Sequence, residues 1–206
     1  MDFIVWLSFV AIATTNIVTP GPAILNTIRR ATQLGLRKTI PTILGNALGL
    51  AVAGGFCAGG VATFVMASEL LWTLFHWLGV GYLVWLGLKL IFVREELDLS
   101  GEARRGVLAR QLFIEAFTLA VSNPKAVLFF VAIFPQVMDA SRPVLPQAVI
   151  LVSTFCAISI GSLFSYSTLA SLLRGRFLTQ RRYRVFRTVS GVLLLGFAGR
   201  LAREVR

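Results

Sequence analysis

The stretch that decides the fold is TNIVTPGPAILN, residues 15–26, which places Pro20 and Pro22 inside a long apolar run. Proline lacks an amide hydrogen, and its ring displaces the carbonyl four residues earlier. A helix through this stretch therefore leaves the carbonyls of Asn16 and Val18 without their usual partners. In water such a break is an ordinary loop. In lipid each unmet group costs several kcal/mol unless protein or a water-filled cavity receives it.

The composition is that of a polytopic membrane protein. Of 206 residues, 56% are hydrophobic and 14% are charged, with a mean hydropathy of +0.79, which is far from the composition of a soluble domain. Crossing the hydrocarbon core takes about 20 residues. We predict an all-α membrane protein, a single transporter-like domain over residues 1–206, with six transmembrane helices. The predicted spans are Phe3–Ile28, Ile40–Ser68, Leu70–Leu88, Leu112–Met138, Val144–Leu173 and Thr188–Gly199.

The sixth span is short, and residues 186–202 cross the bilayer only if Arg187 and Arg200 extend toward the two surfaces.

The net charge of +11 follows from topology and gives no reason to expect a nucleic-acid partner. Fifteen of the 20 basic residues fall in the first, third and fifth connections between the predicted spans. By the positive-inside rule these connections face the cytoplasm, which places both termini outside, in the periplasm. The partner that we expect for these basic connections is the lipid bilayer.

The two halves of the chain share the position of their breaks. Pro20 in the first span and Pro124 in the fourth are 104 residues apart, and the same shift superimposes the starts of the second and fifth spans. Three spans in each half is an odd number, so a repeat must be inverted, as in many secondary transporters whose broken helices meet near the midplane. We predict halves of about 1–93 and 111–206, joined by a cytoplasmic linker at 94–110. The alternative is that two proline-containing helices match by chance.

Three spans each carry polar or small residues at spacings of three and four, which place them on one helix face. Lipid disfavours such faces, so all three should point into the bundle. Four glycines in the second span have the spacing of close helix packing, and any exposed part of that seam favours a homodimer. The faces are Thr15, Thr19, Pro22 and Asn26 in the first span, Thr42, Asn46, Gly49 and Ala53 in the second, and Glu115, Thr118, Ser122 and Lys125 in the fourth; the glycines are Gly45, Gly49, Gly55 and Gly59.

Lys125 is the strongest single signal in the sequence. It follows Asn123 and Pro124 in the middle of a 27-residue span, where an ammonium group must be neutral, paired or ready to bind an anion. Glu115 is about 15 Å away along a helix and is too distant to be its partner. We expect Lys125 to lie beside the backbone groups that the two breaks leave unpaired. A cation in that position could bind the carboxylate of a substrate. The alternative is a lysine that pairs with backbone carbonyls as a structural tie.

Three motifs together resemble those of the LysE/RhtB family of amino-acid exporters. They are TPGP at 19–22, the Gly45–Asn46 pair in the second span, and NPK at 123–125 in a proline-broken fourth span, and the resemblance runs the whole length of the chain. It implies secondary export of amino acids across the bacterial inner membrane, with the substrate near the two breaks. The expected substrate-binding residues are Asn16, Thr19, Gly21, Asn46, Asn123 and Lys125, and the expected hinges are Pro20, Pro22 and Pro124.

The coupling ion that this resemblance favours is H⁺, although no predicted span has a carboxylate at mid-depth. Glu115, near the cytoplasmic end of its span, is the best remaining proton carrier, and Lys125 is the alternative. The same scarcity of acids disfavours a basic substrate, whose side chain would need a negative site. We therefore expect small neutral amino acids of the homoserine or threonine type, the alternative being basic amino acids or another small metabolite.

Other function classes find little support in the sequence. An enzyme would need a nucleophile with a base, or a metal cluster, and the chain has one histidine, His76, without an acid at its depth. The two cysteines, Cys57 and Cys156, lie mid-span without further ligands, so no metal, cofactor or enzymatic activity is expected. A channel or a structural membrane protein remains an alternative, but gives no reason for two paired helix breaks.

Overall fold

The computed structural model describes residues 1–61, 69–92, 108–139, 141–173 and 179–203, and every regular element in these ranges is helical, as predicted. Most of the predicted linker at 94–110, and the end of the second span at 62–68, lie outside the described residues. The elements are α1 (Phe3–Val18), α2 (Pro22–Leu34), α3 (Leu36–Phe56), the π-helical segment η1 (Cys57–Val61), α5 (Glu69–Phe92), α6 (Ala109–Val121), α7 (Pro124–Val137), α8 (Val144–Leu172) and α9 (Gln180–Arg203).

Both expected breaks divide a helix in two. The axes of α1 and α2 differ by 55°, and those of α6 and α7 by 46°. Pro22 and Pro124 are the first residues of α2 and α7, a position where the missing amide hydrogen has no intrahelical partner to lose. Pro20 lies between α1 and α2 and prevents α1 from continuing. The prolines therefore define where each second half-helix begins.

The structure supports membrane crossing for some of the six predicted spans. Residues Leu36–Gly60 and Val144–Leu172 are each long and apolar enough to cross a bilayer, and the number rises to four if each bent pair counts as one crossing. The predicted third and sixth spans fall within α5 and α9, which are not among these four. The chain is thus a membrane protein by the composition of its helices, while a total of six spans stays a prediction.

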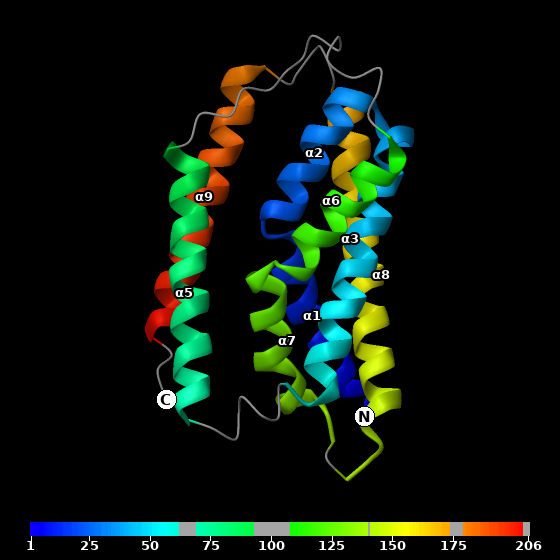
Figure 1. The fold of residues 1–206 in the computed structure, drawn as a ribbon, viewed down its shortest axis with the longest axis vertical. Coiled ribbons are helices and arrows are strands. Elements are labelled where there is room, and N and C mark those ends of the chain that lie inside the picture. The colour runs from blue at the N-terminus through cyan, green and yellow to red at the C-terminus, as the bar shows by residue number, and fades with distance from the viewer. Residues whose placement is uncertain (62–68, 93–107, 140, 174–178, 204–206) are drawn as a thin grey trace.

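The helices run alternately up and down the long axis of the molecule (Figure 1). The α1–α2 pair rises through the whole height, α3 returns, α5 rises, the α6–α7 pair returns, α8 rises and α9 returns. The helices α5 and α9 pack side by side, beside a bundle formed by the others. The most extensive contacts are α3 with α6, α5 with α9, α3 with α8 and α2 with α8. Each of these contacts joins the first half of the chain to the second.

An aromatic cluster packs beside the breaks and fixes α7 against α1 and α8. Phe130 lies 4.8 Å from Phe155, measured between ring centroids, and Phe129 lies 5.0 Å from Phe155 and 5.9 Å from Phe9. All four are buried. Tilted ring pairs at these separations are favourable beyond the area that they bury. This cluster gives the second half-helix of the fourth span a rigid support.

The face of α3 that was expected to point inward does so, because Thr42, Asn46 and Ala53 are buried. The prediction for α6 was wrong, since Thr118 and Ser122 are exposed. The side of α6 that meets α3 instead carries small and apolar residues, because the two backbones come too close for polar side chains between them. These residues are Leu112, Ala116 and Ala120.

The four glycines that were predicted to pack in the second span divide into two groups. A Cβ on Gly49 would lie 2.6 Å from the carbonyl oxygen of Phe117, and one on Gly45 would overlap that of Phe113. These two glycines therefore let the backbones of α3 and α6 touch, as expected for a packing seam. Gly55 and Gly59 have open space around them and line a groove of about 980 Å³ between α3, η1 and α8. The packing expectation was wrong for this second pair within the described chain.

We expect Gly49→Ala to lower the free energy of unfolding by about 1–3 kcal/mol, because the added methyl group forces α3 and α6 apart. Denaturation of the purified protein in detergent would measure this change. Gly55→Ala is the matched control on the same helix, where nothing lies within 4 Å of the new Cβ, and it should be neutral or slightly stabilising. Equal effects of the two substitutions would contradict the proposed seam.

Candidate functional site

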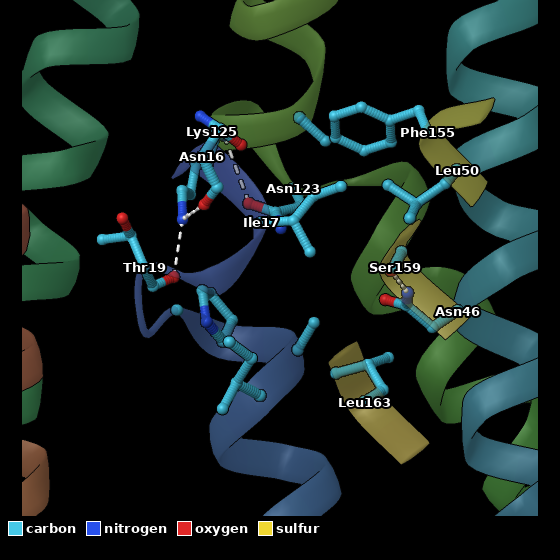
Figure 2. Close-up of a pocket in the computed structure, with 15 residues that line it drawn as sticks. Asn16, Ile17, Thr19, Asn46, Leu50, Asn123, Lys125, Phe155, Ser159 and Leu163 are labelled. Atoms are coloured by element: carbon cyan, nitrogen blue, oxygen red, sulfur yellow. Dashed lines mark hydrogen bonds between the residues drawn. The ribbon is translucent and has the colours of Figure 1, made fainter. Parts of the chain in front are cut away.

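The two helix breaks meet at one cavity of about 50 Å³ (Figure 2). A single water needs about 10–15 Å³ by the same kind of measure, so the cavity has room for several water-sized groups. The α1–α2 break, α3, α7 and α8 all contribute to its walls. It brings together most of the residues predicted from sequence, namely Asn16, Thr19, Gly21, Pro22, Asn46, Asn123 and Lys125, while Pro20 and Pro124 lie next to lining residues in the chain.

Lys125 reaches across the cavity from α7 to the break in the first span. Its Nζ atom donates hydrogen bonds to the carbonyl oxygens of Asn16 and Thr19, at 2.7 Å and 2.8 Å (Figure 2). The residue is only 9% exposed. An ammonium group has three hydrogens, and within the described ranges Nζ has these two partners alone. Lys125 therefore pairs with backbone carbonyls, which was the structural alternative in the sequence analysis. The third hydrogen of its buried ammonium group has no partner within the described ranges.

Side chains from other helices donate hydrogen bonds to the carbonyls that the prolines leave without intrahelical partners. The carbonyl of Asn16 accepts from Lys125, and that of Val18 accepts from the Tyr166 hydroxyl of α8 at 3.2 Å. The backbone N–H and the hydroxyl of Thr19 both donate to the carbonyl of Thr15. The break is thus held from two other helices. Sequence reasoning identified the two unmet carbonyls but missed Tyr166 as the partner of one of them.

The two breaks differ in how the following helix begins. At α7, the side chain of Asn123 caps the helix by accepting from the backbone N–H of Lys125 at 3.2 Å. At α2, the N-cap residue is Gly21 and no side chain caps the helix. The first N–H groups of α2, at Ala23 and Ile24, belong to residues that line the cavity. An uncapped helix N-terminus carries a partial positive charge and donors suited to an anion.

The uncapped end of α2 lies beside the Lys125 cation. A Cβ on Gly21 would be 3.7 Å from Nζ and 3.7 Å from Cδ of Lys125. An anion held by the free N–H groups of α2 would therefore also meet the ammonium group. Two independent sources of positive potential, a side-chain charge and a helix end, converge on one side of the cavity.

The opposite wall is formed by α3 and α8 and was largely missed. The Nδ2 atom of Asn46 donates to Oγ of Ser159 at 3.1 Å, and both residues are at least 96% buried. Leu50, Phe155 and Leu163 complete this wall. Sequence reasoning assigned no site residue to the fifth span. Its polar residues Ser159, Ser162 and Tyr166 follow steps of three and four, and that spacing could have marked an inward face.

Glu115 is the one predicted site residue that the structure sets apart from the cavity. Its carboxylate pairs with Arg29, at 3.1 Å, and with Arg30. Arg29 also donates to Oδ1 of Asn26 at 3.1 Å. This cluster joins α2 to α6, the half-helices of the two broken spans that lie in the upper part of Figure 1. Glu115 therefore contacts both broken spans without lining the cavity.

No metal-binding cluster is found in the described part of the chain, where no three His, Cys, Asp or Glu side chains gather. Cys57 and Cys156 are both free thiols. The residues that line the cavity provide a side-chain cation at Lys125, amide and hydroxyl groups, and the start of α2.

Comparisons with known proteins agree with the motifs. A family model described as LysE type translocator matches residues 14–205. An uncharacterized membrane protein of Vibrio cholerae is 34% identical over 86% of this chain and 86% of its own. A homoserine/homoserine lactone efflux protein of Salmonella typhimurium is 29% identical, covering 82% of each chain, and a leucine efflux protein of Klebsiella pneumoniae is 28% identical over 96% of this chain and 94% of its own. No solved structure matches this chain.

We expect Gly21→Ala to leave the fold intact and to raise the KM for a transported solute about 3- to 10-fold. The backbone at Gly21 is extended (φ −149°, ψ −173°) and accepts an alanine, but the methyl group takes up space 3.7 Å from Nζ in a small, close-packed cavity. Concentration-dependent transport into proteoliposomes would measure the change. Gly161→Ala, on α8 with nothing within 4 Å, is the control, and equal KM values for both variants would contradict the assignment.

Proposed function

Because the chain belongs to the LysE family of translocators, we propose that it exports small neutral amino acids across the bacterial inner membrane. The observation that carries this proposal is the pairing of a buried cation with an uncapped helix end at one wall of a cavity between two broken helices. Relatives named for homoserine and for leucine efflux support amino acids as the substrate class.

The substrate carboxylate binds, in this proposal, between the free N–H groups of α2 and the third hydrogen of Lys125. The carboxylate is therefore held by a helix end and by a side-chain cation, with Lys125 adding the strongest contact. Because the Asn16 and Thr19 carbonyls already hold the cation in place, it is positioned before the substrate arrives.

The lining of the cavity supports a neutral side chain on the substrate. No Asp or Glu is among the described residues that line it, so the side chain of lysine or arginine would have no negative partner there. Its volume of about 50 Å³ also favours small solutes, of which homoserine and threonine are the examples that we prefer.

We extend the proposal to the architecture, as six spans in two inverted repeats. Both broken pairs meet at one cavity, and the contacts of α3 with α8 and of α5 with α9 join spans that the 104-residue shift makes equivalent. Figure 1 also places the start of α1 and the end of α9 toward the same end of the long axis, which supports termini that both face the periplasm. A homodimer stays a prediction, and the groove at Gly55 and Gly59 is the surface where it would form.

Protons are the coupling ion that we propose, with Glu115 as their carrier. The ionised carboxylate holds Arg29 and Arg30 and so ties α2 to α6. Protonation removes the negative charge, and the two half-helices are then free to separate. A proton bound at this position would thereby change access to the cavity from one side, which is the link that ion-driven export requires.

We expect Lys125→Met to slow homoserine transport about 10- to 100-fold, because a charge-assisted hydrogen bond to the carboxylate is lost. Homoserine lactone has no free carboxylate, so its transport should fall much less. Paired measurements of both solutes in proteoliposomes separate a binding role from a structural one. A loss that is equal for acid and lactone would show that Lys125 acts only as a tie between helices.

Tyr166→Phe tests the structural role of the break separately from the role of the Lys125 cation. This variant removes the hydroxyl that holds the carbonyl of Val18 and leaves the cation in place. It should lower the thermal midpoint in detergent while keeping the ratio of homoserine to lactone transport of the unmodified protein.

We expect Glu115→Gln to abolish transport driven by a pH gradient while substrate exchange at equal pH continues, because the amide cannot take up a proton. Counterflow and gradient-driven assays on the same vesicles would measure the two activities. Asp139→Asn, which removes a carboxyl group outside the helices, should retain both. Gradient-driven transport at the normal rate in Glu115→Gln would exclude Glu115 as the carrier.

A further inference from the structure

The hydrogen bond between Asn46 and Ser159 lies across the cavity from Lys125 (Figure 2). It joins α3 to α8 in a wall that is otherwise apolar, with Leu50 and Phe155 on one side and Leu163 on the other (Figure 2). Asn46 and Ser159 are the polar side chains of this wall.

Ser159 differs from exposed serines of the same helix in the partner of its hydroxyl. Ser153 and Ser165 donate to carbonyls of α8 itself, at Ile150 and Gly161, which is the usual arrangement for a serine within a helix. Ser159 instead accepts from Asn46 and, within the described ranges, its own hydrogen has no acceptor. Its hydroxyl is therefore available to a ligand as a donor.

Asn46 likewise keeps hydrogen-bonding capacity. Its amide has two hydrogens and a carbonyl oxygen with two lone pairs, and the bond to Ser159 uses one hydrogen. Neither Oδ1 nor the second hydrogen has a partner in the described part of the chain. Together the two side chains offer one acceptor and two donors to a group that enters the cavity.

We infer that Asn46 and Ser159 form the subsite that recognises the substrate side chain and selects small amino acids that carry a hydroxyl group. A hydroxyl can donate to Oδ1 of Asn46 and accept from Ser159, which matches the capacity that the pair leaves unused. This inference rests on the proposed function, because it assigns the far end of the same substrate whose carboxylate meets Lys125.

The preference should be moderate in size. A site whose polar groups are left entirely unpaired by an apolar analogue discriminates by about 10⁴–10⁵-fold. Here Asn46 and Ser159 keep their bond to each other when an apolar side chain is present, so only the additional bonds are lost. We expect a preference of about tenfold, which corresponds to one net hydrogen bond.

Homoserine and norvaline provide the matched probe, because a methyl group replaces the hydroxyl and the chain length is kept. Initial rates of both should be measured in proteoliposomes that contain the full chain. The unmodified protein should prefer homoserine about tenfold. Ser159→Ala should bring this ratio close to one by slowing homoserine far more than norvaline, and Asn46→Leu, which removes the amide and keeps the bulk, should do the same. Ser165→Ala, on the exposed side of α8, is the control and should keep the ratio of the unmodified protein.

The inference is overturned if the unmodified protein moves both solutes equally well, or if the ratio survives in both Ser159→Ala and Asn46→Leu. Either result would make the Asn46–Ser159 bond a link between helices only. A failure of the proposed function has a different signature, since the unmodified protein would then transport neither amino acid and the inference would fall with it.

Discussion

The structure depends on the partners found for main-chain carbonyls that prolines set free inside an apolar bundle. Each such group is costly in lipid when it is left alone. Lys125 and Tyr166, from α7 and α8, hold the carbonyls of Asn16 and Val18. Three helices from both halves of the chain therefore meet at a point that the local sequence makes unstable. The same requirement brings a cation into the centre of the fold.

The break at α2 is satisfied on one side only, and this asymmetry gives it chemical use. Carbonyls at the end of α1 have partners, whereas the N–H groups that open α2 have no side-chain cap. At the other break, Asn123 caps α7 from within its own segment. One helix end is thus closed by the protein and one is left to a ligand. A cavity built this way offers backbone donors to an anion, as the proposed carboxylate site requires.

The features that follow from local chemistry could be predicted from the sequence. Proline fixes its own geometry, so the breaks at Pro20 and Pro124 were foreseeable, and a lysine in an apolar span had to lie near polar groups. Contacts that cross the fold were harder to predict. Tyr166 and Ser159 meet residues more than 100 positions away, so their spacing along α8 could indicate an inward face but not the residues that they contact. The inward face of α6 was assigned incorrectly because polarity suggested one side, while the close approach to Gly45 and Gly49 of α3 required another.

The packing between the two halves bears on how the chain enters the membrane. The glycine face of α3 is covered by α6, and the inner side of α2 is covered by α8, so the first half has its close-packed surfaces completed only by helices that are synthesised later. Until then, the bare main chain along Gly45 and Gly49 and the strongly polar α2 would meet lipid or the insertion machinery. The sides of α3 and α2 that pack against α6 and α8 therefore stay uncovered until those helices arrive, and the first half cannot reach its final packing alone.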